Sequence, residues 1–166
     1  MQNLKLVGAF NDLQIYCRSG ELSSELRSCL VQFWLDNGAI ANAHDAWLKT
    51  FEVAVIVTDH NGAIVAVSSV YADRLMPDGP TYWFYRTFIQ REKRFQGLSN
   101  LMFHSTFAHL ADQYKAENGA PAGVVIVTEN PKLERPGGHR ILQRGGVEKI
   151  GTDHRGNSVW RKNFVL

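Results

Sequence analysis

The sequence predicts a single α/β domain, residues 1–166, in which helices flank a mixed and mostly antiparallel sheet. Strand-like and helix-like segments follow one another in the order β, α, α, β, β, β, α, β, α, β, β. No internal repeat or low-complexity linker divides the chain, and 45% hydrophobic residues suffice for a sizeable core. A net charge of +2 and 11% aromatic residues argue against disorder.

The chain begins with an expected strand and then a helix. Leu13–Cys17 alternates apolar and polar residues, which indicates an edge strand. In Glu21–Asp36 the apolar side chains recur at helical spacing, and Asn37 with Gly38 forms a stop signal.

A second, shorter helix is expected around Asn42–Phe51. Asn42 is suited to cap its first turn, because an asparagine side chain accepts hydrogen bonds from the free amides there. Trp47 and Leu48 are expected to face the core from this helix.

Three strands are expected next, and two of them form a hairpin. Val53–Thr58 and Ala63–Tyr71 are rich in β-branched residues and flank Asn61 and Gly62, a pair that favours a type I′ turn. Thr81–Gln90, rich in aromatic residues, is the third strand.

The stretch Thr87–Ser99 joins the third strand to a helix that is expected to start at Gly97 and to end near Asn118. A strand that leads through a charged turn to a glycine at a helix start is typical of an anion site. Free amides at the helix start face the anion, and glycine lets the backbone approach it closely. The stretch therefore predicts a phosphate-binding turn.

The remaining third of the chain predicts a buried strand, a short helical segment and two final strands. Val124–Thr128 is an unbroken apolar run, as in a strand buried on both faces. Asn130 followed by proline is expected to begin a helix, and Pro136 is expected to interrupt it. The last two strands are expected at Val147–Gly151 and Ser158–Val165.

The order of elements and the turn before Ser99 resemble the GNAT superfamily of acyl-CoA-dependent N-acyltransferases. Arg94–Ser99 resembles the family's Q/R-x-x-G-x-G/A loop, which holds the pyrophosphate of acetyl-CoA, with Ser99 in place of the last small residue. The strand before the loop would expose its backbone to the pantetheine arm. The residues that the resemblance assigns to the co-substrate acetyl-CoA are Thr87, Phe88, Ile89, Arg94, Phe95, Gln96, Gly97, Leu98, Ser99 and Asn130.

The sequence departs from the family where the general acid and base usually stand. Ile141 occupies the position at which many members carry a tyrosine that protonates the departing thiolate. The strand region that carries a base in some members has no carboxylate here. Tyr85, His139 and Glu52 are the remaining candidates for proton transfer.

The resemblance implies direct transfer of an acetyl group to a small-molecule or protein amine acceptor, and two alternatives stay open. Residues 130–166 hold 8 Lys and Arg against 3 Asp and Glu, whereas residues 1–85 hold 5 against 9. A basic end would suit an enzyme that modifies nucleic acid. The missing tyrosine would suit a CoA-binding interaction module without strong catalysis. The acceptor and the oligomeric state cannot be read from the sequence.

The composition indicates a cytoplasmic protein without a membrane span or a metal site. No apolar run is long enough to cross a bilayer, and the first residues lack the apolar core of a signal peptide. Cys17 and Cys29 follow no metal-binding spacing and are expected to be reduced structural thiols.

Overall fold

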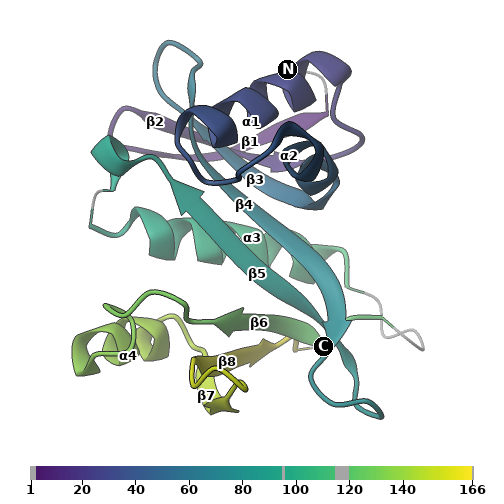
Figure 1. Cartoon of the computed structure of the whole chain (residues 1–166), viewed down its shortest axis with the longest axis vertical. Helices are drawn as coiled ribbons and strands as arrows, with labels where there is room; N and C mark the ends of the chain where they lie inside the picture. The colour runs from purple at the N-terminus through teal and green to yellow at the C-terminus, as the bar shows by residue number, and fades with distance from the viewer. Residues whose placement is uncertain (1–2, 95, 115–119, 166) are drawn as a thin grey trace. The chain divides into compact units, whose positions relative to one another are not determined.

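The computed structural model describes residues 3–94, 96–114 and 120–165, which form two compact units (Figure 1). Unit 1 comprises Met1–Ser69 and Thr87–Thr106, and unit 2 comprises Val70–Arg86 and Phe107–Leu166. Three elements, β4, β5 and α3, run from one unit into the other. The assignment of the whole chain to one domain stays a prediction.

Eight strands and four α-helices make up the described chain. The strands are β1 (Leu4–Phe10), β2 (Leu13–Arg18), β3 (Val53–Thr58), β4 (Ile64–Arg74), β5 (Thr81–Ile89), β6 (Gly123–Val127), β7 (Glu148–Thr152) and β8 (Ser158–Asn163). The helices are α1 (Ser24–Asp36), α2 (Ala43–Lys49), α3 (Leu98–Asp112) and α4 (Pro136–Arg144), with short 3₁₀ turns η1 (Thr50–Glu52) and η2 (Arg91–Lys93). The strand order is β1-β2-β3-β4-β5-β6-β8-β7. Strands β5 and β6 run parallel, whereas β1–β2, β2–β3, β3–β4, β6–β8 and β7–β8 are antiparallel. The predicted mixed, mostly antiparallel α/β class is confirmed.

Both helices near the start of the chain are capped by side chains. The Ser23 side chain accepts from the amide of Leu26 at the start of α1, and Asn42 accepts from Asp45 at the start of α2, as predicted for Asn42. The expectation that Trp47 and Leu48 face the core is wrong. Ala46 is the buried residue of α2, because seven residues present only a narrow face to the sheet.

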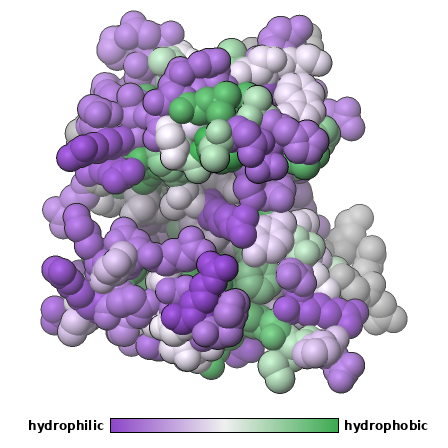
Figure 2. Space-filling view, in the orientation of Figure 1, coloured by the Kyte–Doolittle hydropathy of each residue, from purple (hydrophilic) through white to green (hydrophobic). Residues whose placement is uncertain are grey.

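Trp47, Leu48 and Phe51 therefore lie at the surface, where they are 38%, 53% and 54% exposed. Figure 2 shows hydrophobic surface among hydrophilic side chains over the part of unit 1 that holds α1 and α2. This surface belongs to unit 1.

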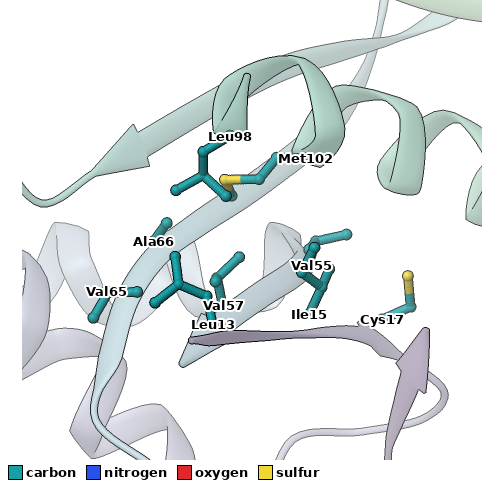
Figure 3. Packing of buried hydrophobic residues seen from close by; sticks show 9 residues of the cluster. All are labelled: Leu13, Ile15, Cys17, Val55, Val57, Val65, Ala66, Leu98 and Met102. Carbon is teal, nitrogen blue, oxygen red and sulfur yellow. The ribbon is translucent and has the colours of Figure 1, made fainter. Parts of the chain in front are cut away.

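The core of unit 1 has two layers, one on each face of β3. All six residues of β3 are buried. Side chains of α1 and α2 pack on one face with Ile56 and Val67, and the first turns of α3 pack on the other face with Val55 and Val57. Figure 3 shows the second layer, in which Leu98 and Met102 of α3 lie over strands β2, β3 and β4. The start of α3 is thus fixed by core packing.

The sequence did not predict β1, which pairs with β2 in an antiparallel hairpin. A register shift between Leu6 and Gly8 breaks the alternation that reveals a strand. Leu6 and Val7 also remain exposed at the sheet edge. Asn11 adopts a φ of 55° at the hairpin turn, a conformation that asparagine tolerates better than most residues.

The turn between β3 and β4 is not the predicted type I′ turn. Only Gly62, with a φ of 81°, adopts a positive φ there, whereas a type I′ turn also needs one at Asn61. The amide of Gly62 donates to the carbonyl of Asp59 at 3.0 Å, and the Asp59 carboxylate accepts from Asn61 and Ala63. The carboxylate stabilises a longer turn in which glycine alone is left-handed.

Two helix boundaries also differ from the prediction. Helix α3 ends at Asp112 rather than near Asn118, and residues 115–119 lie outside the described chain. Asn130 begins a turn, in which its carbonyl accepts from Leu133 at 2.8 Å, rather than a helix. Helix α4 instead begins at Pro136, which occupies the first helical position that proline favours. The residue expected to interrupt a helix therefore starts one.

Unit 2 has its own small core around Tyr82, Val125 and Val159. The predicted buried strand is confirmed as β6, in which Gly123 to Ile126 are buried. The final pair of strands is confirmed as β7 and β8. The aromatic ring of Phe164 packs against Phe107, with ring centroids 5.2 Å apart.

Candidate functional site

The predicted phosphate turn lies in unit 1 and is held by backbone hydrogen bonds. The amide of Gln90 donates to Val65 on β4 at 2.9 Å, which fixes the end of β5. The amide of Lys93 donates to Gln90 at 3.0 Å and closes the turn of η2. The Arg94 guanidinium Nε donates to the Ile89 carbonyl at 3.0 Å and ties the loop to the strand.

Gly97 sets the path of the chain into α3. Its φ is 94°, in the region that side-chain-bearing residues rarely adopt, so glycine is required for its conformation. The first helical hydrogen bond runs from the amide of Leu101 to the Gly97 carbonyl at 2.9 Å. The amides of Leu98, Ser99 and Asn100 precede this bond and have no carbonyl of the helix to donate to. Three donors therefore point out of the helix start.

The electrostatics of this helix start favour an anion. The first turn of α3 contains no acidic residue. The partial positive charge at a helix N-terminus is consequently not neutralised within that turn. Gln96 and Ser99 are exposed at this helix start, and Arg94 is exposed as well. Phe95 lies outside the described residues.

Leu98, Phe88 and Ile89 have side chains that pack against the core, so their backbones are the parts offered to a ligand. Thr87 is exposed. Leu98 is completely buried in the layer shown in Figure 3. Thr87 Oγ1 lies 3.4 Å from the Val67 carbonyl, and the ring of Phe88 meets that of Phe33 edge-on at 5.7 Å. Ile89 packs against the same layer as Leu98. A backbone role was predicted for this strand end, and the packing is compatible with it.

The β1–β2 hairpin supports the loop, which the sequence did not indicate. A Cβ built on Gly97 would lie 3.7 Å from Cζ of Phe10, so the aromatic ring lies close to the glycine. The Asp12 carboxylate lies 3.6 Å from Nζ of Lys93 and 3.9 Å from Nδ1 of His60. Since β1 was not predicted, nothing in the sequence connected Phe10 or Asp12 with residues 93–97.

Unit 2 contains Tyr85, His139 and Asn130. Tyr85 is 8% exposed on β5 and pairs in register with Ile126 of β6. His139 lies on α4 with its ring edge-on to Trp160, at a centroid distance of 5.1 Å. The side-chain oxygen of Asn130 accepts from the amide of Lys132 at 3.0 Å, so it stabilises its own turn.

A carboxylate that the sequence did not single out lies beside His139. Glu134 Oε2 is 3.7 Å from His139 Nε2. The same carboxylate accepts hydrogen bonds from the Ser158 hydroxyl at 2.6 Å, from the Ser158 amide at 2.9 Å and from the Thr128 hydroxyl. These donors, the Ser158 hydroxyl first, lower the pKa of Glu134 to about 2. A fixed negative charge therefore faces one nitrogen of the imidazole.

Glu52 belongs to unit 1, in η1. Its carboxylate lies 2.7 Å from Nζ of Lys49 in the preceding turn, and its side chain is 32% exposed. The ion pair with Lys49 accounts for its position. A role of Glu52 as a base stays a prediction.

Two residues of the basic C-terminal segment are engaged within unit 2. The Arg161 guanidinium donates to Glu148 at 2.5 Å, and Nζ of Lys162 donates to the Gly145 carbonyl at 3.0 Å. Lys162 also lies over the ring of Phe107, 4.3 Å from its centroid. These contacts reduce the charge that the segment offers to a polyanion.

None of the described helices is long and apolar enough to cross a membrane. Within the same residues, no three His, Cys, Asp or Glu side chains gather as a metal site would require.

Comparison with solved structures identifies the fold. The chain is similar to a GNAT-family acetyltransferase from Streptococcus pneumoniae, with a TM-score of 0.64 and 12% identity over 92% of this chain and 99% of that one. It is also similar to a ribosomal-protein-S5-alanine acetyltransferase from Vibrio fischeri, with a TM-score of 0.60 and 13% identity over 95% and 96% of the two chains.

A third similar structure is an acetyltransferase from Salmonella typhimurium that modifies the N-terminal serine of ribosomal protein L7/L12. Its TM-score is 0.60 and its identity is 11%, over 97% of this chain and 100% of that one. The sequence matches no protein-family model and no curated protein. The chain therefore has the fold of the GNAT acetyltransferases, and the resemblance of the sequence to that superfamily is confirmed at the level of fold.

Proposed function

We propose that the protein is an N-acetyltransferase that moves an acetyl group from acetyl-CoA to a primary amine in one ternary complex. The observation that carries this proposal is the start of α3, where Gly97 adopts a φ of 94° before three amides without helical acceptors. A diphosphate needs several convergent N–H donors and a close approach of the backbone. The GNAT fold supports the same assignment.

In this proposal the strand end beside the loop binds the pantetheine arm through its backbone. The Gln90 amide already donates to Val65 on one side of the strand, so we assign the amide that polarises the thioester carbonyl to Ile89, which points to the other side. Arg94, Gln96 and Ser99 supply exposed polar groups for the diphosphate. Positioning and a preorganised amide supply most of the catalysis in such a reaction.

The chemistry requires the amine nitrogen to bond to the thioester carbon while the carbon–sulfur bond breaks. The attacking amine loses a proton, and the departing thiolate gains one. We propose His139 as the residue that transfers the proton, because the Glu134 carboxylate lies 3.7 Å from its Nε2. His139→Gln is expected to lower kcat by about 10²-fold. An unchanged kcat would exclude His139 from the reaction.

Isothermal titration calorimetry with acetyl-CoA tests the binding site directly. Wild-type protein should bind, and Gly97→Trp should not, because an indole at a left-handed position both strains and crowds the turn. Gly8→Trp is the matched control, since a Cβ at Gly8 has no atom within 4 Å. Absence of binding by wild type would refute the acyl-CoA proposal, and binding that survives Gly97→Trp would show that the loop is assigned to the wrong place.

Mass spectrometry with acetyl-CoA and an amine panel separates the enzyme from a CoA-binding interaction module. The panel includes small primary amines and peptides with free N-termini, because some proteins of this fold modify the N-terminal residues of ribosomal proteins. An acetylated product confirms the transferase, whereas thioester hydrolysis without any product favours the module. We also propose a cytoplasmic location, which the two free cysteines support.

A further inference from the structure

We propose that Arg18 and Arg27 form a binding site for a carboxylate or phosphate group, at the place where β2, α1 and η1 meet. The site lies within unit 1 and does not depend on the assignment of the acyl-CoA loop. It attracts an anion although residues 1–85 hold 5 Lys and Arg against 9 Asp and Glu.

Arg27 is a charged side chain that the fold has buried, with 8% of it exposed. Its Nε donates to the Leu22 carbonyl at 3.1 Å, and its Nη1 donates to the Thr50 hydroxyl at 2.8 Å. The guanidinium also lies over the ring of Phe51, 4.0 Å from the centroid. These contacts are to neutral groups, so they orient the guanidinium without neutralising its charge.

Arg18 approaches the same phenylalanine from β2. Its Nη1 donates to the Phe51 carbonyl at 2.8 Å. Burial, and then the positive charge of Arg27, lower the pKa of Arg18 below its usual range. Arg18 and Arg27 thus both contact Phe51, the first at its carbonyl and the second at its ring.

No carboxylate compensates this pair in the described part of the chain. The ion pairs found there within 4.0 Å join other residues, and Glu52, which follows Phe51, is paired with Lys49. Arg27 lies near the N-terminal end of α1, where the helix dipole disfavours a cation. Two guanidiniums without a counter-ion are costly, and a bound oxyanion would remove that cost.

The site is open to a ligand. Phe51, on which both arginines converge, is 54% exposed, and Arg18 is only partly buried. Guanidinium groups bind carboxylates and phosphates through paired, parallel hydrogen bonds, and stacking on an aromatic ring holds the fork in one plane. A purely structural role for Arg27, holding the start of α1 to η1, would not by itself require Arg18 beside it.

Titrations followed by NMR of the arginine Nε–H signals test the site on the full chain. Sodium phosphate and sodium acetate are the probes, with sodium chloride at matched ionic strength as reference. The Arg18 and Arg27 signals should shift saturably with at least one oxyanion and not with chloride. Tighter binding of acetate would identify a carboxylate site, and tighter binding of phosphate a phosphate site.

Variants decide whether the shifts report binding at this pair. Arg18→Gln should weaken the oxyanion about tenfold to a hundredfold, because one charge-assisted hydrogen bond is lost. Arg74→Gln, which removes an exposed arginine of unit 2, should leave the affinity unchanged. Because Arg27 is buried and its replacement can unfold the chain, Arg18→Gln is the decisive variant. Absence of saturation, equal shifts with chloride, or undiminished affinity in Arg18→Gln would overturn the proposal.

Discussion

Replacing Gly97 by alanine isolates the conformational demand of the loop from its packing. A Cβ at this position would meet the Phe10 ring at 3.7 and 3.9 Å, which are ordinary contacts, so no clash is expected. The φ of 94° remains, and a left-handed conformation costs a residue with a Cβ about 1–2 kcal/mol. Alanine also restricts the unfolded chain, which stabilises the folded state by ~0.4–1 kcal/mol. The expected net decrease in the free energy of unfolding is about 1 kcal/mol.

Two glycine-to-alanine controls should change the free energy of unfolding by less and by more than Gly97→Ala does. The free energy is measured by urea unfolding followed by tryptophan fluorescence. Gly8→Ala has open space and no positive φ, so it should be neutral or stabilising by up to ~1 kcal/mol. Gly123→Ala would place a Cβ 2.7 Å from Cα of Asn163, so it should cost about 3 kcal/mol or more. Calorimetry on Gly97→Ala should show acetyl-CoA binding weakened about tenfold by the displaced amides. If Gly97→Ala unfolds at the same urea concentration as Gly8→Ala, the strain argument is wrong.

Three further substitutions test packing and charge. Leu98→Ala should lower the free energy of unfolding by about 2–5 kcal/mol, since this completely buried side chain anchors the start of α3. Leu48 is 53% exposed, so Leu48→Gln should change the free energy of unfolding by less than about 0.5 kcal/mol in the same urea experiment. Glu134 has its pKa lowered from 4.5 to about 2 in the fold, so its hydrogen bonds with Ser158 and Thr128 stabilise the protein fully above pH 4.5 and are lost as the pH falls toward 2. Glu134→Gln should therefore flatten the fall of the melting temperature over that range, and an unchanged slope would contradict the assignment.

The elements that the sequence predicted well are those whose local pattern matches their surroundings. All of β3 is buried and appears in the sequence as a β-branched run, and α1 has both a cap and an apolar stripe. The strand β1 was missed because its bulge at Gly8 breaks the period of two, and no local rule restores it. Edge strands with exposed residues carry the weakest pattern.

The boundary of α4 shows why proline and glycine were misread in unit 2. Pro136 was expected to interrupt a helix, although the same residue is favoured at a helix start. A proline interrupts a helix when the residues before it are helical, and it starts one when they are not. The packing of Gly138 decides between them, because a Cβ there would lie 2.6 Å from the Leu133 carbonyl oxygen. Such a close approach of two backbone segments cannot be seen in the sequence.

The candidate sites differ in predictability for the same reason. The anion turn depends on a backbone conformation. The residue that permits this conformation, Gly97, can be recognised in the sequence as a glycine at an expected helix start. The arginine pair depends on side chains from β2 and α1 that meet only after folding, and Arg18 and Arg27 are nine residues apart in a region without a motif. A site built from a backbone conformation can therefore be predicted from a glycine at a helix start. A site built from side chains that lie far apart in the sequence has to be found from charge and burial in the folded chain.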